Sequence, residues 1–175
     1  MFQVNDTIFY GADGICVVAG IEQRSFHGRM QEYYVLRPVH SGRATIYVPT
    51  GSEKLREKMR RLPSADEVYT MIRAMPDEAP LWIEEETARK QAYAQTLREG
   101  DSAGLLRLLK GLHLRREGLK GTGRKFHACD ERFMKEAEKL ICEEFAFVLH
   151  LEPGQVLPLM MEEIKREERR RTAGA

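Results

Sequence analysis

The hydrophobic pattern of the first fifty residues is that of short β-strands. Runs of β-branched and aromatic residues alternate with turn-forming stretches such as Gly11–Gly14 and His27-Gly28. These runs are Thr7–Tyr10, Ile15–Ile21, Glu32–Leu36 and Ala44–Val48. Because no helical stretch interrupts them, the pattern predicts an antiparallel sheet with hairpin connections. The strands are too few for a sandwich, and curling protects sheet edges, so we expect a small barrel of the SH3 or Tudor type.

After Pro49 the spacing of the apolar positions becomes that of helices. Ser64 and Glu67 have the spacing of a capping box, which predicts that a helix begins there. The Met75-Pro76 step ends this helix, because a proline disfavours helical geometry in the residue before it. A second helix is expected from about Leu81 to Leu97.

The remainder of the chain predicts further helices joined by one basic loop. Asp101 can cap a helix with a leucine stripe, and Gly118–Gly123 indicates a mobile loop. A long helix is expected from about Ala128 to Leu149, and a last packed segment begins at Pro153. The sequence thus predicts an α+β protein with a β-domain over 1–55, a helical bundle over 62–165, and a charged, frayed tail over 166–175.

The overall composition is that of a water-soluble globular protein. Hydrophobic residues make up 42% and charged residues 31% of the 175 residues. No apolar run approaches the length of a membrane span, and the first residues lack the features of a secretion signal, so we expect a cytoplasmic protein without membrane contact. Three widely spaced cysteines do not suggest a disulfide framework.

Positive charge is concentrated in one stretch, although the net charge of the chain is only +1. Residues 104–125 hold seven basic residues and a single acid, Glu117. A local basic patch can bind phosphate, because its field acts over about 10 Å at ordinary salt. A solvated helix face and loop would have the same composition, so both interpretations stay open.

Catalytic and metal-binding motifs do not stand out in this sequence. The five histidines are scattered, and the nearest approach to a metal motif is His127 with Cys129, which lacks a second pair of ligands. The glutamates at 84–86 and 143–144 are typical of solvated helix faces. We therefore expect a protein that is not an enzyme and has no cofactor or metal. A metal-dependent enzyme using His127 and Cys129 is kept as an alternative.

Trp82, the single tryptophan, allows two interpretations. A lone tryptophan in a helical domain is more often a core residue. Here prolines precede it and three glutamates follow Ile83, so the apolar stripe is poor and the ring would be presented at the start of a helix. An exposed aromatic residue near basic helices can act as a wedge between base steps or as a stacking platform.

The order of several short motifs resembles that of bacterial transcription factors of the CarD type. Each motif is loose, but their joint order is specific and covers about residues 1–150. The motifs are Phe2–Gly11, Gly14–Val18, Glu32–Leu36, Ile46–Pro49, Trp82, Arg98–Asp101, Leu112–Arg116 and Phe133–Leu149.

The resemblance implies a Tudor-like domain that binds the β subunit of bacterial RNA polymerase. Of two polymerase-contacting arginines in the family, the first matches Arg24, whereas the second position holds Tyr47. This departure removes a charge-assisted contact, so the interface is expected to rely more on the strand backbone. The residues assigned to polymerase binding are Arg24, Thr45, Ile46, Tyr47 and Val48.

The resemblance also implies that the helical domain inserts Trp82 into the minor groove at the upstream edge of the opening promoter bubble. Three glutamates follow closely, and the first basic residues come about two turns later, so we expect weak and largely sequence-independent binding of promoter DNA. The residues assigned to DNA are Trp82, Arg89, Lys90, Arg115, Arg116, Lys120, Arg124 and Lys125. The alternative is a protein-interaction adaptor without DNA contact, in which Trp82 belongs to the core.

Overall fold

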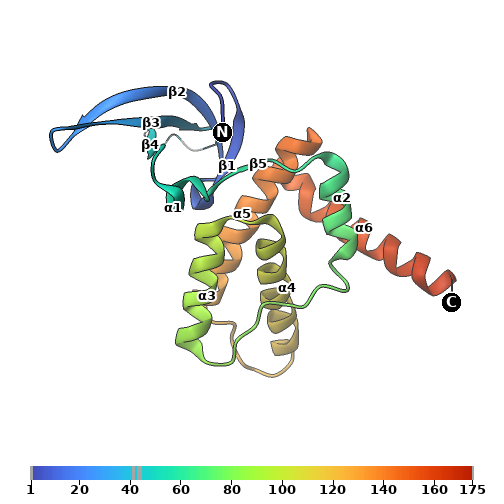
Figure 1. The fold of residues 1–175 in the computed structure, drawn as a ribbon. Helices are drawn as coiled ribbons and strands as arrows, with labels where there is room; N and C mark the ends of the chain where they lie inside the picture. Colours follow the sequence, from blue (N-terminus) through green and yellow to red (C-terminus); the bar gives the residue numbers. More distant parts are fainter. Residues whose placement is uncertain (1, 41, 43–44, 175) are drawn as a thin grey trace. The chain divides into compact units, whose positions relative to one another are not determined.

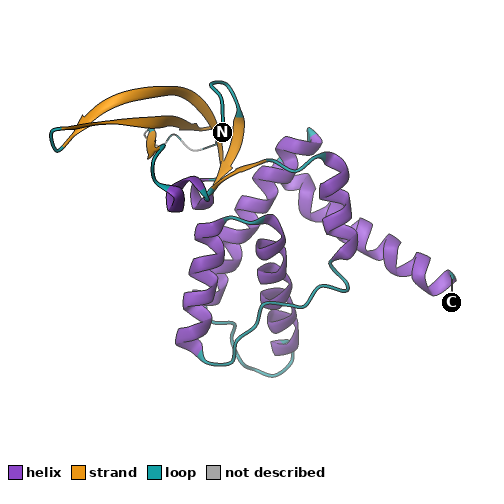
Figure 2. Cartoon of the chain, viewed as in Figure 1, coloured by secondary structure: helices purple, strands orange, loops and turns teal. Residues whose placement is uncertain are grey.

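The computed structural model describes residues 2–40, 42 and 45–174, and the chain divides into two compact units. The first unit, Met1–Leu62, is built on a β-sheet, and the second, Pro63–Ala175, is helical (Figures 1 and 2). This agrees with the predicted α+β organisation. The boundary lies later than the predicted residue 55, because a short strand after that point belongs to the first sheet.

The β unit contains one antiparallel sheet with the strand order β4-β3-β2-β1-β5. Its strands are β1 (Thr7–Tyr10), β2 (Ile15–Phe26), β3 (Arg29–Pro38), β4 (Ile46–Pro49) and β5 (Met59–Arg61). A short 3₁₀ turn, η1 (Gly11–Asp13), joins β1 to β2, and helix α1 (Glu53–Arg56) joins β4 to β5. The predicted strand from Ala44 begins in the structure at Ile46, and Ala44 itself lies outside the described residues.

The closed barrel expected from the sequence is not seen in the described part of the sheet. Closure requires the two edge strands to pair, and the edges are β4 and β5. The chain between them forms α1 instead, and Leu55 of this helix packs against the hydrophobic core of the unit. The chain between the two edge strands therefore forms a helix that packs on the core, and β4 and β5 stay unpaired with each other in the described residues.

Alternation along the strands separates a core face from an outer face. Tyr34, Leu36 and Val48 belong to the buried core together with residues of β1 and β2, so their odd-numbered neighbours on these strands point to the opposite face. The β2–β3 hairpin turns at His27 and Gly28, which both have positive φ values, as a type I′ turn requires.

The described residues of the helical unit form five helices. They are α2 (Ala65–Ala74), α3 (Glu86–Glu99), α4 (Ser102–Leu119), α5 (Ala128–Leu149) and α6 (Pro153–Ala173). Helices α4 and α5 pack together, with α3 beside them, and α2 and α6 complete the unit. Fully buried side chains from all five helices form its core: Val68, Ile72, Tyr93, Leu105, Leu108, Leu112, Ile141, Phe145 and Val156. In the described residues no helix has the length and apolar character that a membrane span requires.

Two predicted helix starts are confirmed by their hydrogen bonds. The Glu67 amide donates to Ser64 Oγ at 3.2 Å, and the Ser64 amide donates to the Glu67 carboxylate at 2.7 Å, which completes the capping box of α2. The Gly104 amide donates to Asp101 Oδ2 at 2.8 Å at the start of α4. Both helix starts could be predicted from the sequence, because each cap is formed by residues three positions apart.

The second predicted helix begins later than Leu81. Helix α3 starts at Glu86, because the carboxylate of Glu85 accepts hydrogen bonds from the Thr87 and Ala88 amides and so acts as its N-cap. These two backbone hydrogen bonds lower the pKa of Glu85 below its usual value. Trp82 consequently lies in the connection that precedes α3, and not within a helix.

The C-terminal segment also differs from the prediction. Helix α6 continues to Ala173, through most of the stretch expected to be a frayed tail. The Arg171 guanidinium pairs with Glu167 one turn earlier at 3.3 Å and with Asp77, outside the helix, at 2.7 Å. Such pairs support a helix whose residues are otherwise highly charged, although each contributes little by itself.

Candidate functional site

The connection between α2 and α3 is attached to α4 by backbone contacts. The Leu81 amide donates to the carbonyl of Arg107 at 3.0 Å. This close approach requires Gly111, because a Cβ atom at that position would lie 2.2 Å from the Leu81 carbonyl oxygen. The Lys110 ammonium donates to three carbonyls nearer the start of the connection, those of Met75, Pro76 and Glu78.

Side chains of α3 hold the end of the same connection. The Arg89 guanidinium donates to the carbonyls of Ile83 at 2.9 Å and Glu84 at 3.1 Å. The Tyr93 hydroxyl, whose pKa burial raises to about 12, donates to the Leu81 carbonyl at 3.5 Å. The backbone of the segment 81–85 is therefore held by hydrogen bonds from both α3 and α4.

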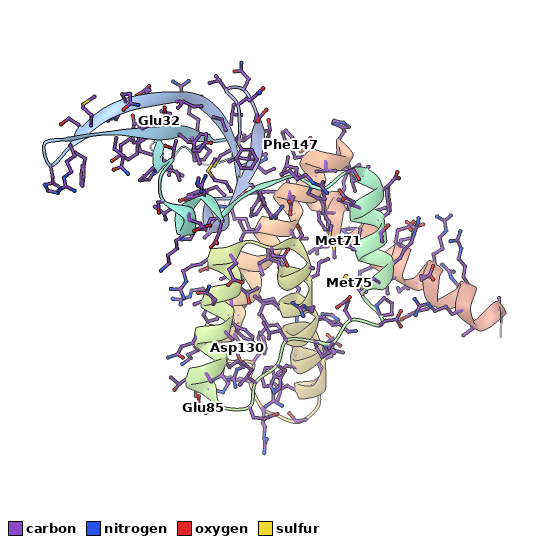
Figure 3. The ribbon with its side chains drawn as sticks, in the orientation of Figure 1. Glu32, Met71, Met75, Glu85, Asp130 and Phe147 are labelled. Atoms are coloured by element: carbon purple, nitrogen blue, oxygen red, sulfur yellow. The ribbon has the colours of Figure 1, made fainter. Side chains whose placement is uncertain are left out.

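Arg89 is a buried structural residue. Only 6% of its surface is exposed, and its Nε lies 3.7 Å from Oδ1 of Asp130, which is itself buried on α5 (Figure 3). A phosphate contact would require this side chain to leave its carbonyl and carboxylate partners. The ion pair between α3 and α5 thus argues against a DNA contact by Arg89, although its assignment to DNA stays a prediction.

Trp82 is half-buried, so it is neither the fully buried core residue nor the fully exposed ring that the sequence left open. Its indole Nε1 donates to Glu84 Oε1 at 2.9 Å. Two guanidinium groups lie against the ring, with Cζ of Arg89 4.5 Å and Cζ of Arg115 5.2 Å from its centroid. Such contacts are favourable for an aromatic face and a cation. The ring thus has a polar partner at its nitrogen and charged groups over its face.

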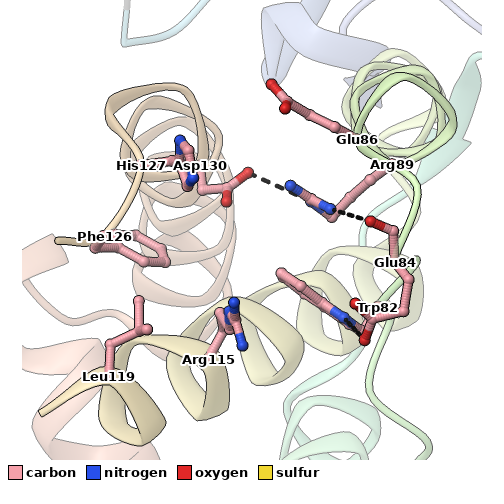
Figure 4. A pocket seen from close by; sticks show the side chains of 9 residues that line it. All are labelled: Trp82, Glu84, Glu86, Arg89, Arg115, Leu119, Phe126, His127 and Asp130. Atoms are coloured by element: carbon pink, nitrogen blue, oxygen red, sulfur yellow. Dashed lines mark hydrogen bonds and ion pairs between the residues drawn. The ribbon is translucent and has the colours of Figure 1, made fainter. Parts of the chain in front are cut away.

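A small cavity of about 170 Å³ opens beside the Trp82 ring. Phe126 and Leu119 line the side away from Trp82, Arg115 lies between them and the Trp82 ring, and the Arg89–Asp130 pair lines a further side (Figure 4). The sequence analysis assigned neither Phe126 nor Asp130 to a functional site. The only hint was a phenylalanine placed directly after two basic residues, Arg124 and Lys125.

The remaining residues assigned to DNA lie on the surface. The side chains of Arg115, Arg116, Lys120, Arg124 and Lys125 are exposed, at the end of α4 and in the loop that follows it. Lys120 pairs with Glu117 at 2.7 Å. Lys90 is half-buried and pairs with Glu86 on the same helix, which raises the pKa of Lys90 and lowers that of Glu86. Of these residues, Arg115 contacts Trp82, whereas Lys90 lies on α3 next to Glu86.

The outer face of the β-sheet brings together the two positions assigned to polymerase contact. The Arg24 guanidinium lies over the ring of Tyr47, with Cζ 3.8 Å from the ring centroid, and pairs with Glu22 at 3.1 Å. Tyr33 meets Tyr47 edge-on, with 6.5 Å between the ring centroids. Tyr33 was missed in the sequence, because its proximity to Tyr47 follows from the register of β3 and β4. We call Arg24, Tyr33 and Tyr47 the aromatic–arginine patch.

The other β4 residues assigned to polymerase differ in exposure. Val48 is fully buried, and Ile46 is partly buried against the core, so most of the surface of these two side chains is out of reach of a partner. Thr45 and Tyr47 are exposed. The Thr50 amide donates to Glu32 of β3, so in an antiparallel ladder the backbone groups of Thr45 and Tyr47 point away from β3, toward the outer edge. The surface that a partner could reach therefore consists of the patch and this edge, rather than the whole strand.

His127 and Cys129 lie at the start of α5, where His127 is the N-cap residue. In the residues that the structure describes, no group of three or more histidine, cysteine, aspartate or glutamate side chains could hold a metal ion. The free thiols of Cys16 and Cys142 are embedded in the fold, which raises the pKa of Cys16 to about 12 and that of Cys142 to about 11.

Comparison with known protein families identifies the first unit. Residues 2–63 match the family model of the CarD-like/TRCF RID domain. The match covers all five strands of the sheet and ends at the boundary between the two units. It confirms the resemblance to CarD-type proteins over this part of the chain, and it is consistent with a CarD-like family.

Proposed function

We propose, on the premise of an N-terminal CarD-like/TRCF RID domain, that this protein is a non-enzymatic regulator of transcription. The family match supports an RNA polymerase-interacting, transcription-related protein. In the proposal, the β unit binds the β subunit of the polymerase through the aromatic–arginine patch and the outer edge of β4. The helical unit contacts promoter DNA, with Trp82 as a wedge at the upstream edge of the bubble.

The β unit has the features that a protein-binding surface needs. Arg24 and Tyr47 are residue types enriched at the energetically important positions of interfaces. The side chain of Arg24 is 48% exposed, so a partner can reach its guanidinium without unfolding the sheet. The outward backbone groups of β4 add a place where an extended segment of a partner can pair.

The observation that carries the DNA part is the position of Trp82. The ring lies in a fixed connection outside a helix, beside an arginine and near the exposed basic residues of α4 and its loop. Opening a promoter unstacks base pairs at the fork, at a cost of a few kcal/mol per step. A wedge that fits the distorted groove better than relaxed duplex shifts this equilibrium by its difference in affinity. Attachment to polymerase supplies a high local concentration, so DNA binding can be weak.

The Trp82→Ala change tests this function. We expect a loss of thermal stability well below the roughly 3–5 kcal/mol that truncation of a buried aromatic costs, because the ring is outside the core. Polymerase co-purification should persist, whereas the increase in open-complex lifetime should disappear. Trp82→Phe is the matched control, since it keeps an apolar ring. An unchanged open-complex lifetime in Trp82→Ala would remove the wedge from the proposal.

A second candidate function is a protein-interaction adaptor without DNA contact. One observation favours it: Leu114, Leu157 and Met161 are exposed around an apolar groove of the helical unit. On this alternative, neither Trp82 nor the basic loop affects DNA. Crosslinking of promoter DNA to the helical unit within the polymerase complex separates the two functions, because only the first predicts a crosslink.

A further inference from the structure

The apolar groove of the helical unit shares no lining residue with the cavity beside Trp82. The groove has a volume of about 610 Å³, and it is lined by residues of α4, α5 and α6 together with Met75 and Pro76, which follow α2 (Figure 3). Most of the lining residues are apolar. An apolar hollow of this kind on the surface is typical of a binding site.

The groove is long enough to accept a helix. Its lining residues on α6 run from Leu157 to Glu168, which corresponds to about three turns, or roughly 16 Å. On α4, Leu114 is 52% exposed, and on α6, Met161 is 49% exposed, so a partner can cover both side chains without any change in the core. Amphipathic helices bind in such grooves through apolar residues one turn apart.

Methionines make the surface of the groove adaptable. Four of them line it: Met75, Met134, Met160 and Met161. Met134 and Met160 are buried, whereas Met161 is exposed. The methionine side chain is unbranched, flexible and polarisable, so methionine-rich surfaces adjust to the shape of what they bind. This favours a protein segment with several apolar side chains over a single rigid ligand.

The helices around the groove carry charges of opposite sign. The α4 side has His113 and Arg116, whereas Glu138 lies on α5 and Glu168 on α6. Lys110 of α4 also lines the groove, but its ammonium already donates to three backbone carbonyls. A partner that complements these charges has acidic groups on one flank and basic groups on the other.

The charges at the groove are available to a partner. Among the described residues, Arg116, Glu138 and Glu168 form no ion pair. Other charged residues of α5 and α6 are paired one turn away, namely Lys135 with Glu131, Lys139 with Glu143, and Arg171 with Glu167. An ion pair between the groove and a partner therefore breaks none within the chain.

We infer that this groove is the docking site for an amphipathic helix of a partner protein. The helix places apolar residues one turn apart into the groove, acidic residues toward Arg116, and basic residues toward Glu138 and Glu168. A helix is the peptide conformation that presents an apolar stripe between two polar flanks. The inference goes beyond the proposed function, and it holds whether or not the helical unit also contacts DNA.

Two synthetic peptides of about 15 residues, long enough to form a helix, test the complementarity. Both carry the same leucine stripe at helical spacing. The matched peptide has lysines on one flank and glutamates on the other, whereas the neutral peptide has glutamine at all of these positions. Fluorescence anisotropy of each labelled peptide measures its binding to the full chain at low salt. We expect the matched peptide to bind about tenfold more tightly than the neutral peptide.

Protein variants locate the binding. Leu114→Ser removes an exposed apolar side chain from the groove, so it should weaken both peptides by about tenfold or more. The double change Glu138→Lys with Glu168→Lys should lower the affinity of the matched peptide to that of the neutral peptide, and leave the neutral peptide unchanged. Glu162→Lys is the matched control, because Glu162 is an exposed residue of α6 that does not line the groove. It should change neither affinity. A thermal melt verifies the fold of each variant.

The outcomes are distinct from those that decide the proposed function, because these assays contain neither DNA nor polymerase. If the unmodified protein binds neither peptide, or binds both equally, the inference is overturned, and this comparison depends on no variant. Undiminished binding by Leu114→Ser also overturns it. Sedimentation of the unmodified protein adds one check: a dimer that Leu114→Ser converts to a monomer would mean that a second copy of the chain covers the groove, which overturns the inference as well.

Discussion

Arg24 and Arg89 each lie against an aromatic ring, but the two arginines have opposite surroundings. The Arg24 side chain is 48% exposed and its partner Glu22 is 49% exposed, whereas the corresponding values for Arg89 and Asp130 are 8% and 3%. An exposed pair contributes about 0–1 kcal/mol, so Arg24 can exchange its partner for a group on another protein. A buried pair cannot be broken without leaving a charge uncompensated. The exposed ion pair therefore leaves Arg24 available for recognition, whereas the buried ion pair makes Arg89 part of the scaffold.

The largest effect is expected from Arg89→Met. This change leaves the carboxylate of Asp130 buried without its cation, so the free energy of unfolding should fall by about 3–5 kcal/mol. A thermal melt of the full chain measures it. The double change Arg89→Met with Asp130→Leu removes both charges and should recover much of the loss. A single variant as stable as the unmodified protein would contradict the structural role of Arg89.

A smaller effect is expected from Gly111→Ala. The added Cβ would lie 2.2 Å from the Leu81 carbonyl, so the connection that carries Trp82 has to shift, at a cost of about 1–3 kcal/mol. Trp82 fluorescence should change with it. Gly118→Ala is the matched control in the same helix, because nothing lies within 4 Å of its added Cβ. Alanine there should stabilise α4 by up to about 1 kcal/mol. Equal stability of the two variants would contradict the close approach at Gly111.

On the β unit, Arg24→Glu should change the melting temperature little, since the pair it breaks is exposed. At an interface, charge reversal turns attraction into repulsion, and polymerase affinity should fall by about 1–3 kcal/mol. Co-purification or a binding titration with polymerase measures this. Exposed Arg37, on the same sheet, serves as a charge-reversal control. Undiminished binding of Arg24→Glu would remove Arg24 from the interface.

The smallest effects are expected from single neutralisations in the basic loop. Lys125→Gln should weaken binding of fork DNA at low salt and reduce the slope of log affinity against log salt by about 1 if the ammonium contacts one phosphate. Lys120→Gln should do less, because Lys120 already pairs with Glu117. A salt slope unaffected by both changes would show that this loop does not contact the DNA backbone.

Features determined by nearby residues could be predicted from the sequence. The capping box of Ser64 and Glu67 and the cap at Asp101 depend on spacings of three residues, and both are present. The features that were missed depend on contacts between distant segments. Arg89 and Lys90 look equivalent in the sequence, yet only Arg89 faces Asp130 of α5. The cavity likewise combines residues of a connection, two helices and a loop, an arrangement that no local pattern encodes.

Sheet closure and the C-terminal helix were misjudged for related reasons. Whether β4 pairs with β5 depends on the course of the chain between them, and α1 occupies that stretch. The predicted fraying of the last residues considered only their charge. The structure instead pairs Arg171 with Asp77, which lies in the connection between α2 and α3.

The Lys110 ammonium has a consequence for how the sequence of this protein can vary in length. It fixes the connection at Glu78, and the amide of Leu81 fixes it again, so only Ala79 and Pro80 span the interval. The length of this interval therefore sets the position of Trp82 relative to α4. A residue inserted before Met75 changes the register of α2. A residue inserted at Ala79-Pro80 instead shifts Trp82 by one position relative to the hydrogen bonds that hold the connection to α4. Length variation in homologous chains should therefore avoid this dipeptide, even though it is an exposed loop of the kind that usually tolerates insertions.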